Sequence, residues 1–316
     1  MKSPRPASRS RPKAKSLHPR SLHNRPYDFS ALISSHPPLG RYVSVKQHGQ
    51  PSIDFANANA VKALNAALLQ HHYQIHAWDI PAGALCPPIP GRADYLHCLA
   101  ELLGIAPPTH IPASHHRDFT LLDIGTGASG IYPLLACQLY GWRCVASDIN
   151  PQSLANVAVI LEQNPTLKPR ISLRLQPEPQ RMFAGIIQPD EFYQLSVCNP
   201  PFHASAEQAL KSSQRKQSNL ARNRGKPASG DSLNFGGQAA ELWCKGGERL
   251  FLRNLAKESQ TFARQCRWFS SLVSKSENVK PLIKLLRKLG ALQVKEIPMS
   301  QGNKITRVLA WTFIAP

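Results

Sequence analysis

The segment FTLLDIGTGASG, residues 119–130, decides the fold class of this chain. Its first half is apolar and indicates a buried strand, and its second half is a glycine-rich turn that opens a helix to about Tyr140. Downstream, the pattern predicts a strand ending at Asp148, a helix over 151–163 and a strand over 171–175. Strands that alternate with helices predict an α/β fold, a mostly parallel sheet with right-handed crossovers.

The glycine turn and two acidic residues indicate which cofactor such a sheet would bind. Backbone amides at the start of a helix can approach a ligand closely, as in dinucleotide-binding folds. Asp148 ends the second strand, where an acid suits a ribose diol. Asp123 would repel a pyrophosphate but attract a sulfonium. The pattern therefore favours S-adenosylmethionine over NAD. The candidate cofactor-binding residues are Asp123, Gly125, Thr126, Gly127 and Asp148.

A second stretch, Asn199-Pro200-Pro201-Phe202, ends an apolar run over 193–198 that predicts another buried strand. Because proline has a fixed φ and no amide hydrogen, the chain must leave the sheet there in a rigid turn. Such a turn presents one amide side chain, two carbonyl oxygens and an aromatic face, which together match a planar amine. These four residues are the candidate catalytic residues. An ordinary Pro-Pro loop capped by Asn is the alternative.

The composition favours a polyanionic partner and excludes several classes of protein. Lys and Arg number 38 against 19 Asp and Glu, a formal net charge of +19, which favours nucleic acid first and an anionic membrane surface second. We expect no membrane segment and no secretory signal, because no apolar run is long enough. Seven scattered cysteines without a C-x-x-C pair, and twelve histidines without acidic partners, predict a reduced, metal-free, cytoplasmic protein.

The N-terminal third is predicted to hold two separate units. Residues 1–26 carry Lys, Arg, Pro and Ser without an acid, and we expect a flexible basic arm that captures phosphates, or a merely solvated tail. Residues 27–104 indicate a compact accessory, RNA-binding unit with a helix over 54–70 and a short strand over 75–80. A second helix over 92–103 follows, and residues 105–316 form the cofactor-binding domain.

Arg92 starts that second helix, where the positive end of the helix dipole makes a cation unusual. It is either an ordinary surface residue, or it points at a carboxylate or phosphate beyond the helix.

A polar loop over 203–235 follows the Asn-Pro-Pro-Phe turn, and it contains no acid between Glu207 and Asp231. Loops of this length are usually functional or disordered. We expect it to be mobile and to capture a nucleic-acid strand, and a solvated insertion is the alternative. Its candidate RNA-binding residues are Lys211, Arg215, Lys216, Arg222, Arg224 and Lys226.

The last third returns to alternating elements. The pattern predicts a helix from Gly246 to about Ser259, a strand over 267–273 and a helix over 278–289. Two final strands, 291–297 and 307–315, are separated by a Gly302-Asn303 turn and predict an antiparallel hairpin at the sheet edge.

Four segments together resemble a known family: DIGTGASGIYPLL, CNPPF, LHPR…RPYDFSAL and QGNKITRVLAW. They are similar to the bacterial 23S ribosomal RNA adenine N6-methyltransferases and to the eukaryotic enzyme that methylates spliceosomal small nuclear RNA. The likeness runs from about Leu17 to Trp311. It implies a Rossmann-like S-adenosylmethionine-dependent methyltransferase fold. It also implies methylation of one adenine, position 1618 by the family's name, in 23S ribosomal RNA or a large-subunit assembly intermediate.

The resemblance also implies roles for single residues. It implies that Arg92 pairs with the carboxylate of the cofactor. It also implies cofactor contacts from Gly125, Ser129, Asp148 and Asn199. Asn199 would touch the target amine as well. A weaker match over 179–187 adds Arg181 and Met182.

Two other functions fit part of the pattern. A protein-glutamine methyltransferase acting on a translation factor uses the same Asn-Pro-Pro turn, but the net charge of +19 argues against it, and Phe202 stands where those enzymes usually have Tyr. A nonenzymatic RNA-binding assembly factor would not need Asp123, the glycine loop, Asp148 and Asn199 all intact.

Overall fold

The computed structural model describes residues 17–45, 49–105, 119–205, 207–208, 239–301 and 304–315. The six candidate RNA-binding residues of the 203–235 loop lie outside the described residues. The first sixteen residues of the predicted arm and the Gly302-Asn303 turn lie outside them as well.

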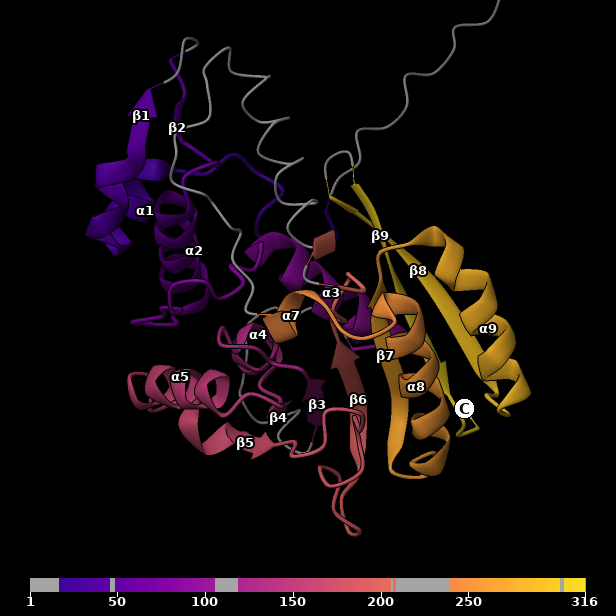
Figure 1. Ribbon diagram of the computed structural model, residues 1–316. Helices are drawn as coiled ribbons and strands as arrows, with labels where there is room; N and C mark the ends of the chain where they lie inside the picture. Colours follow the sequence, from indigo (N-terminus) through magenta and orange to yellow (C-terminus); the bar gives the residue numbers. More distant parts are fainter. Residues whose placement is uncertain are drawn as a thin grey trace, which may run out of the picture.

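A seven-stranded sheet forms the centre of the molecule, in the order β5-β4-β3-β6-β7-β9-β8 (Figure 1). The parallel strands are β3 (Thr120–Ile124), β4 (Arg143–Asp148), β5 (Ile171–Leu175), β6 (Tyr193–Cys198) and β7 (Cys266–Val273). The strands β8 (Gln293–Gln301) and β9 (Lys304–Thr312) pair antiparallel with each other, and β9 pairs antiparallel with β7. The predicted parallel sheet with an antiparallel C-terminal hairpin is confirmed.

Helices cover both faces of this sheet. The helices α3 (Ile89–Leu102), α4 (Ile131–Tyr140) and α5 (Pro151–Glu162) share one apolar core, and α8 (Gly247–Thr261) and α9 (Val279–Lys288) share the other. Side chains alternate along each strand, so Leu121 joins the first core and Leu122 the second. This alternation explains why the strands are almost entirely apolar: each of their faces is buried.

The N-terminal unit packs beside the sheet (Figure 1, indigo and purple). It contains α1 (Phe29–Ser35), a 3-10 helix (Pro37–Tyr42), β1 (Val43–Val45), β2 (Pro51–Ile53) and α2 (Ala58–Tyr73). The predicted helix over 54–70 therefore begins later, at the residue after Asn57, because the Asn57 side chain caps it by accepting from the Ala60 amide at 3.1 Å. Likewise α3 begins earlier than expected, at Ile89, with a proline in its first turn.

The prediction of a short strand over 75–80 is wrong. Ile75, Trp78 and Ile80 are buried, as a strand pattern suggests, but their backbone is irregular. Gln74 and Ala77 both have a positive φ, which turns the chain out of an extended path. The apolar side chains anchor a loop in the core rather than a strand in a sheet.

The flexible-arm prediction is wrong for the part of the arm that the structure describes. The His18 amide donates to Asp94 of α3 at 2.9 Å, and the His23 ring bonds the Tyr73 hydroxyl of α2 at 2.8 Å. Ser21 and His23 are each 8% exposed. Uncharged imidazole, phenol and hydroxyl groups can be buried when they pair with one another, which a count of charges does not reveal.

Two absences hold for the described part of the chain. Within it, no helix combines the length and apolar character needed to cross a bilayer. Nor do the described residues bring together three or more His, Cys, Asp or Glu side chains that could hold a metal ion.

Candidate active site

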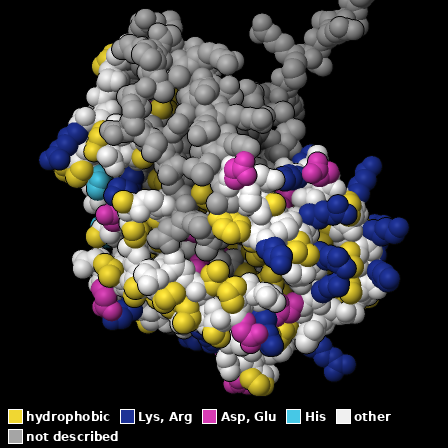
Figure 2. Space-filling model, viewed as in Figure 1, with side chains coloured by type: hydrophobic (Ala, Val, Ile, Leu, Met, Phe, Trp, Pro, Cys, Tyr) yellow, Lys and Arg dark blue, Asp and Glu magenta, His cyan; other side chains and the backbone are white. Residues whose placement is uncertain are grey.

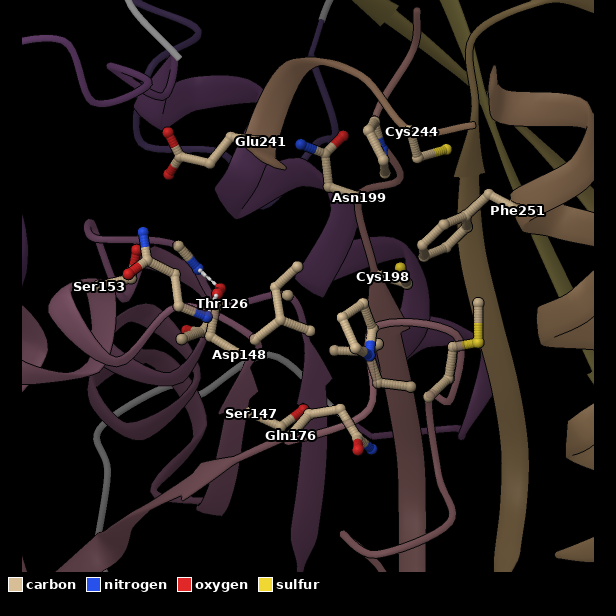
Figure 3. A pocket seen from close by; sticks show the side chains of 18 of the residues that line it. Thr126, Ser147, Asp148, Ser153, Gln176, Cys198, Asn199, Glu241, Cys244 and Phe251 are labelled. Atoms are coloured by element: carbon tan, nitrogen blue, oxygen red, sulfur yellow. Dashed lines mark hydrogen bonds between the residues drawn. The ribbon is translucent and has the colours of Figure 1, made fainter. Parts of the chain in front are cut away.

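A cavity of about 610 Å³ lies where β3, β4 and β6 end (Figure 3). Parallel strands present their carboxyl ends at one edge of a sheet, so the loops that follow them converge there. The glycine loop, Asp148, Gln176 and Asn199 line one part of the cavity, and residues from α7 (Ala239–Leu242) to α8 line another. The volume suits one ligand of cofactor size.

The glycine loop is held in a tight, fixed turn. The Gly125 and Thr126 amides both donate to the Ser147 carbonyl at 2.9 Å. Gly125 and Gly127 have φ values of 73° and 63°, a region that side chains with a Cβ rarely adopt. A Cβ on Gly127 would also stand 2.7 Å from the Glu241 carboxylate. Gly125, Thr126, Gly127 and Ser129 all line the cavity, as the sequence predicts.

Asp148 lines the same cavity at the end of β4 (Figure 3). One carboxylate oxygen accepts from the Gly127 amide and the other from the Asn150 amide, each at 2.8 Å. Burial raises the pKa of Asp148, while these two amide bonds lower it. Each oxygen keeps lone-pair capacity, so the oriented carboxylate can accept the two hydroxyls of a ribose diol.

Asp123 does not lie where we expected it. It is absent from the cavity lining and fully buried, with 0% exposure. Its neighbour Ile124 lines the cavity, and successive strand residues face opposite ways, so the carboxylate points toward the side of the sheet that α3 and α4 cover. Burial raises its pKa to about 7, and the charge of Asp148 adds to the rise. The nearby Thr126 hydroxyl and the positive charge of Arg92 act in the opposite direction and lower the pKa.

Arg92 reaches the cavity from α3. Its guanidinium donates to the Tyr132 hydroxyl at 2.8 Å and lies 5.5 Å from the centre of that ring. The residue is 9% exposed. No described carboxylate forms an ion pair with it. A buried cation at a cavity wall attracts the anionic end of a ligand.

The Asn-Pro-Pro-Phe turn contributes only two of its four residues to the wall. Asn199 and Pro201 line the cavity, whereas Pro200 and Phe202 do not. The side-chain oxygen of Asn199 is buried and has no hydrogen-bond partner among the described residues. Buried polar atoms in proteins are nearly always paired, so this oxygen has an unused capacity to accept a hydrogen bond.

The far side of the cavity comes from residues that the sequence did not single out. Trp243, Phe251 and Asn254 line it, and Phe251 rather than Phe202 presents an aromatic ring there (Figure 3). The segment is tied to the turn, because the His203 amide donates to Leu242 and the Cys244 amide donates to His203. Trp243, Phe251 and Asn254 follow a long loop and belong to no recognisable sequence motif. Only their observed position in the structure identifies them as lining residues.

Glu241 joins three parts of the molecule at this cavity. One of its oxygens accepts from the Leu85 amide of the N-terminal unit at 2.9 Å. The other accepts from the Ala128 amide of the glycine loop at 3.4 Å. Glu241 itself lies on α7 and lines the cavity.

Arg181 and Met182 also line the cavity, where the resemblance placed them. The loop that carries them is fixed on α8, since Glu258 accepts from the Met182 and Ala184 amides, each at 2.8 Å.

Comparison with known proteins identifies close relatives over nearly the whole chain. A family model described as RNA methyltransferase matches residues 11–315. "Ribosomal RNA large subunit methyltransferase F" of Saccharophagus degradans is 60% identical over 312 residues, which are 97% of this chain and 98% of the relative. The protein of the same name from Shewanella baltica is 58% identical over 300 residues, 95% of this chain and 81% of the relative.

Solved structures show the same fold. The catalytic domain of human METTL16, in complex with the MAT2A 3′UTR hairpin 6, is 30% identical, with a TM-score of 0.77 over 95% of this chain and 98% of that one. The N-terminal domain of human METTL16 in complex with SAH is 27% identical, with a TM-score of 0.73 over 95% of this chain and 100% of that one.

Proposed function

The chain belongs to the RNA methyltransferase family, and we propose that it transfers the methyl group of S-adenosylmethionine to the N6 amine of one adenine in large-subunit ribosomal RNA. The relatives named as large-subunit ribosomal RNA methyltransferases support the substrate class. The single observation that carries the reaction is the unpartnered Asn199 oxygen in the wall of the cavity.

The cavity residues fit S-adenosylmethionine. Asp148 would accept the ribose hydroxyls, Arg92 would pair with the carboxylate of the amino-acid part, and the glycine loop would pack against the nucleoside. A bound S-adenosylmethionine supplies an electrophilic methyl group on a sulfonium. The SAH complex of human METTL16 supports this cofactor.

The Asn199 side chain would hold the acceptor. An N–H group of the adenine amine would donate to the Asn199 oxygen, which draws the nitrogen lone pair out of conjugation with the ring. The same oxygen would stabilise the positive charge that develops on nitrogen. Correct alignment supplies most of the rate, and the charged product can release its proton to water.

An aromatic side chain would stack on the adenine. We expected Phe202 in this role, but Phe251 and Trp243 line the cavity instead, so we assign the stacking face to them.

The N-terminal unit would take part in the site rather than act as a separate module. We propose boundaries at 27–104 for an accessory, RNA-binding unit and 105–316 for the methyltransferase domain. Arg92 and Leu85, both of the accessory unit, line the cavity, which supports a shared site. A cytoplasmic location follows from a ribosomal substrate.

The test is a map of methylated adenines in ribosomal RNA from cells with and without this protein. We expect one adenine of the large-subunit RNA to lose its methyl group in the deletion strain. The wild-type gene should restore it and Asn199→Ala should not. Identical maps in both strains would overturn the proposal, and a translation factor that loses glutamine methylation would favour the other acceptor.

A further inference from the structure

The outer surfaces of α8 and α9 concentrate exposed cations. Figure 2 shows Lys and Arg side chains gathered on the right of the molecule, where Figure 1 places these two helices. We call this surface the α8–α9 basic face. It comprises ten exposed residues: Lys245, Arg249, Arg253, Lys257, Arg264, Lys275, Lys280, Lys284, Arg287 and Lys288.

Acidic side chains do not neutralise this face. Glu248 is 1% exposed and bonds the Ser274 amide and the Asn278 side chain in the interior. Glu258 accepts backbone amides of the 182–184 loop. Glu277 is the one exposed acid between residues 245 and 288. None of the ten cations forms an ion pair with another residue in the described part of the chain.

The other face of the sheet has no such charge. The helices α4 and α5 contain no Lys or Arg, although they cover the same sheet. The single cation of α2, Lys62, is paired with Asp79 at 2.7 Å, and the single cation of α3, Arg92, is buried. The cations on α8 and α9 are therefore not needed for packing a helix against this sheet. Positive charges that lie close together repel one another, so their concentration on one face favours binding of an anionic partner.

The cations also have a regular spacing that begins at the cavity. Arg249, Arg253 and Lys257 recur every four residues, which places them on one side of α8 about 6 Å apart. Lys280, Lys284 and Lys288 do the same on α9, which packs against α8. Lys245, just before α8, lines the cavity itself. The row on α8 thus leads away from the cavity, and the row on α9 lies on the neighbouring helix.

We propose that the α8–α9 basic face binds a second segment of the large-subunit ribosomal RNA through its phosphates, while the target adenine lies in the cavity. This inference rests on the proposed function. Flexible Lys and Arg side chains on a helix surface match phosphates and read no sequence. A lipid surface fits less well, because the apolar side of α9, with Val279, Leu282 and Leu286, is buried in the core and cannot insert into a bilayer.

The test compares two double variants that remove the same charge. Arg253→Ala with Lys284→Ala alters the basic face, and Arg143→Ala with Lys168→Ala removes two exposed cations elsewhere. Each protein is tested for binding to a full-length 23S ribosomal RNA transcript over a range of salt. Single-turnover methylation is then measured on that transcript and on a short stem-loop with the target adenine.

For the basic-face variant, we expect the slope of log K against log salt to fall by about 1.4 to 1.8 on the full-length RNA, with affinity roughly tenfold lower. Methylation of the short stem-loop should stay within about twofold of wild type. The control variant should match wild type on both RNAs.

Several outcomes would overturn the inference. One is a basic-face variant that binds the full-length RNA with the control's affinity and salt slope. With ribosomal particles as an additional substrate, another is normal binding to naked RNA together with lost methylation of the particles, which would indicate an acidic protein partner. In an added binding assay with anionic vesicles, a third is a loss of vesicle binding alone, which would indicate a membrane. Failure of the wild type to methylate either RNA would refute the proposed function and leave the binding comparison intact.

Discussion

At the scale of single residues, the proposed chemistry rests on the Asn199 side-chain oxygen. It is buried at the cavity wall without a partner among the described residues, and an unmade hydrogen bond of this kind costs about 1 to 3 kcal/mol. In the proposed reaction, an amine that donates to this oxygen would relieve the cost. Substrate binding and charge stabilisation would then draw on the same atom.

Asn199→Ala is expected to lower the rate of methyl transfer by on the order of 100- to 1,000-fold, because it removes an acceptor that faces developing charge. Binding of S-adenosylhomocysteine should change by less than about fivefold, since Arg92, Asp148 and the glycine loop remain. Single-turnover kinetics and calorimetric titration measure the two quantities. A rate within a few fold of wild type would remove Asn199 from the mechanism.

Asp123 makes the stability of the ligand-free protein depend on pH. Burial raises its pKa from 3.8 to about 7. Between these values the unfolded chain ionises while the folded chain keeps the proton, so the contribution of Asp123 to stability falls as pH rises through that window. Above about pH 7 the carboxyl is ionised in both states, and the loss in the free energy of unfolding reaches its full value, on the order of 4 kcal/mol.

Asp123→Asn should therefore be more stable, relative to wild type, at pH 8 than at pH 5. Urea unfolding of both proteins without cofactor gives the difference at each pH. The exposed Asp190→Asn serves as the control for loss of a surface carboxylate. A pH-independent difference for Asp123→Asn would show that this carboxyl does not titrate in the window.

At the scale of elements, α7 links separate segments of the cavity wall. The Glu241 carboxylate on this short helix accepts amides from the glycine loop and from the N-terminal unit, so it joins three segments that are distant in sequence. Glu241→Ala is expected to weaken S-adenosylhomocysteine binding by about tenfold, because two amides lose an acceptor and the loop loosens.

Glu241→Gln keeps one of the two oxygen acceptors, so its dissociation constant should lie between those of wild type and Glu241→Ala. The exposed Glu162→Ala is the matched control for loss of a carboxylate, and it should bind normally. Equal weakening by the Gln and Ala variants would mean that charge, not the amide contacts, is what the cavity needs.

At the scale of the whole molecule, residues 17–26 tie the chain start to α2 and α3. Deletion of residues 1–16 removes six Lys or Arg and should flatten the salt dependence of RNA binding. Deletion of 1–26 should also lower the free energy of unfolding by about 2 kcal/mol or more, because Asp94 and Tyr73 lose buried partners. Denaturant unfolding and salt titration separate the two effects. Equal stability of both deletions would contradict the docking of 17–26.

The sequence alone predicted those features whose pattern lies within a single helix, strand or turn. The strand–glycine turn–helix segment of residues 119–140 predicted the parallel sheet, because hydrophobic period and glycine placement are properties of neighbouring residues. The same holds for Asp148, which ends a strand, and for Asn199, which precedes two prolines.

Only the tertiary structure determined which way a side chain points and which segments distant in sequence contact each other. Asp123 is fully buried and absent from the cavity lining, whereas its neighbour Ile124 lines the cavity, because side chains alternate along β3 and the sequence does not say which of them reaches it. Phe251 replaces Phe202 at the wall, and residues 17–26 are ordered, because segments far apart in the chain supply the contacts. Spacing in sequence cannot encode such contacts: they form only when packing brings the segments together.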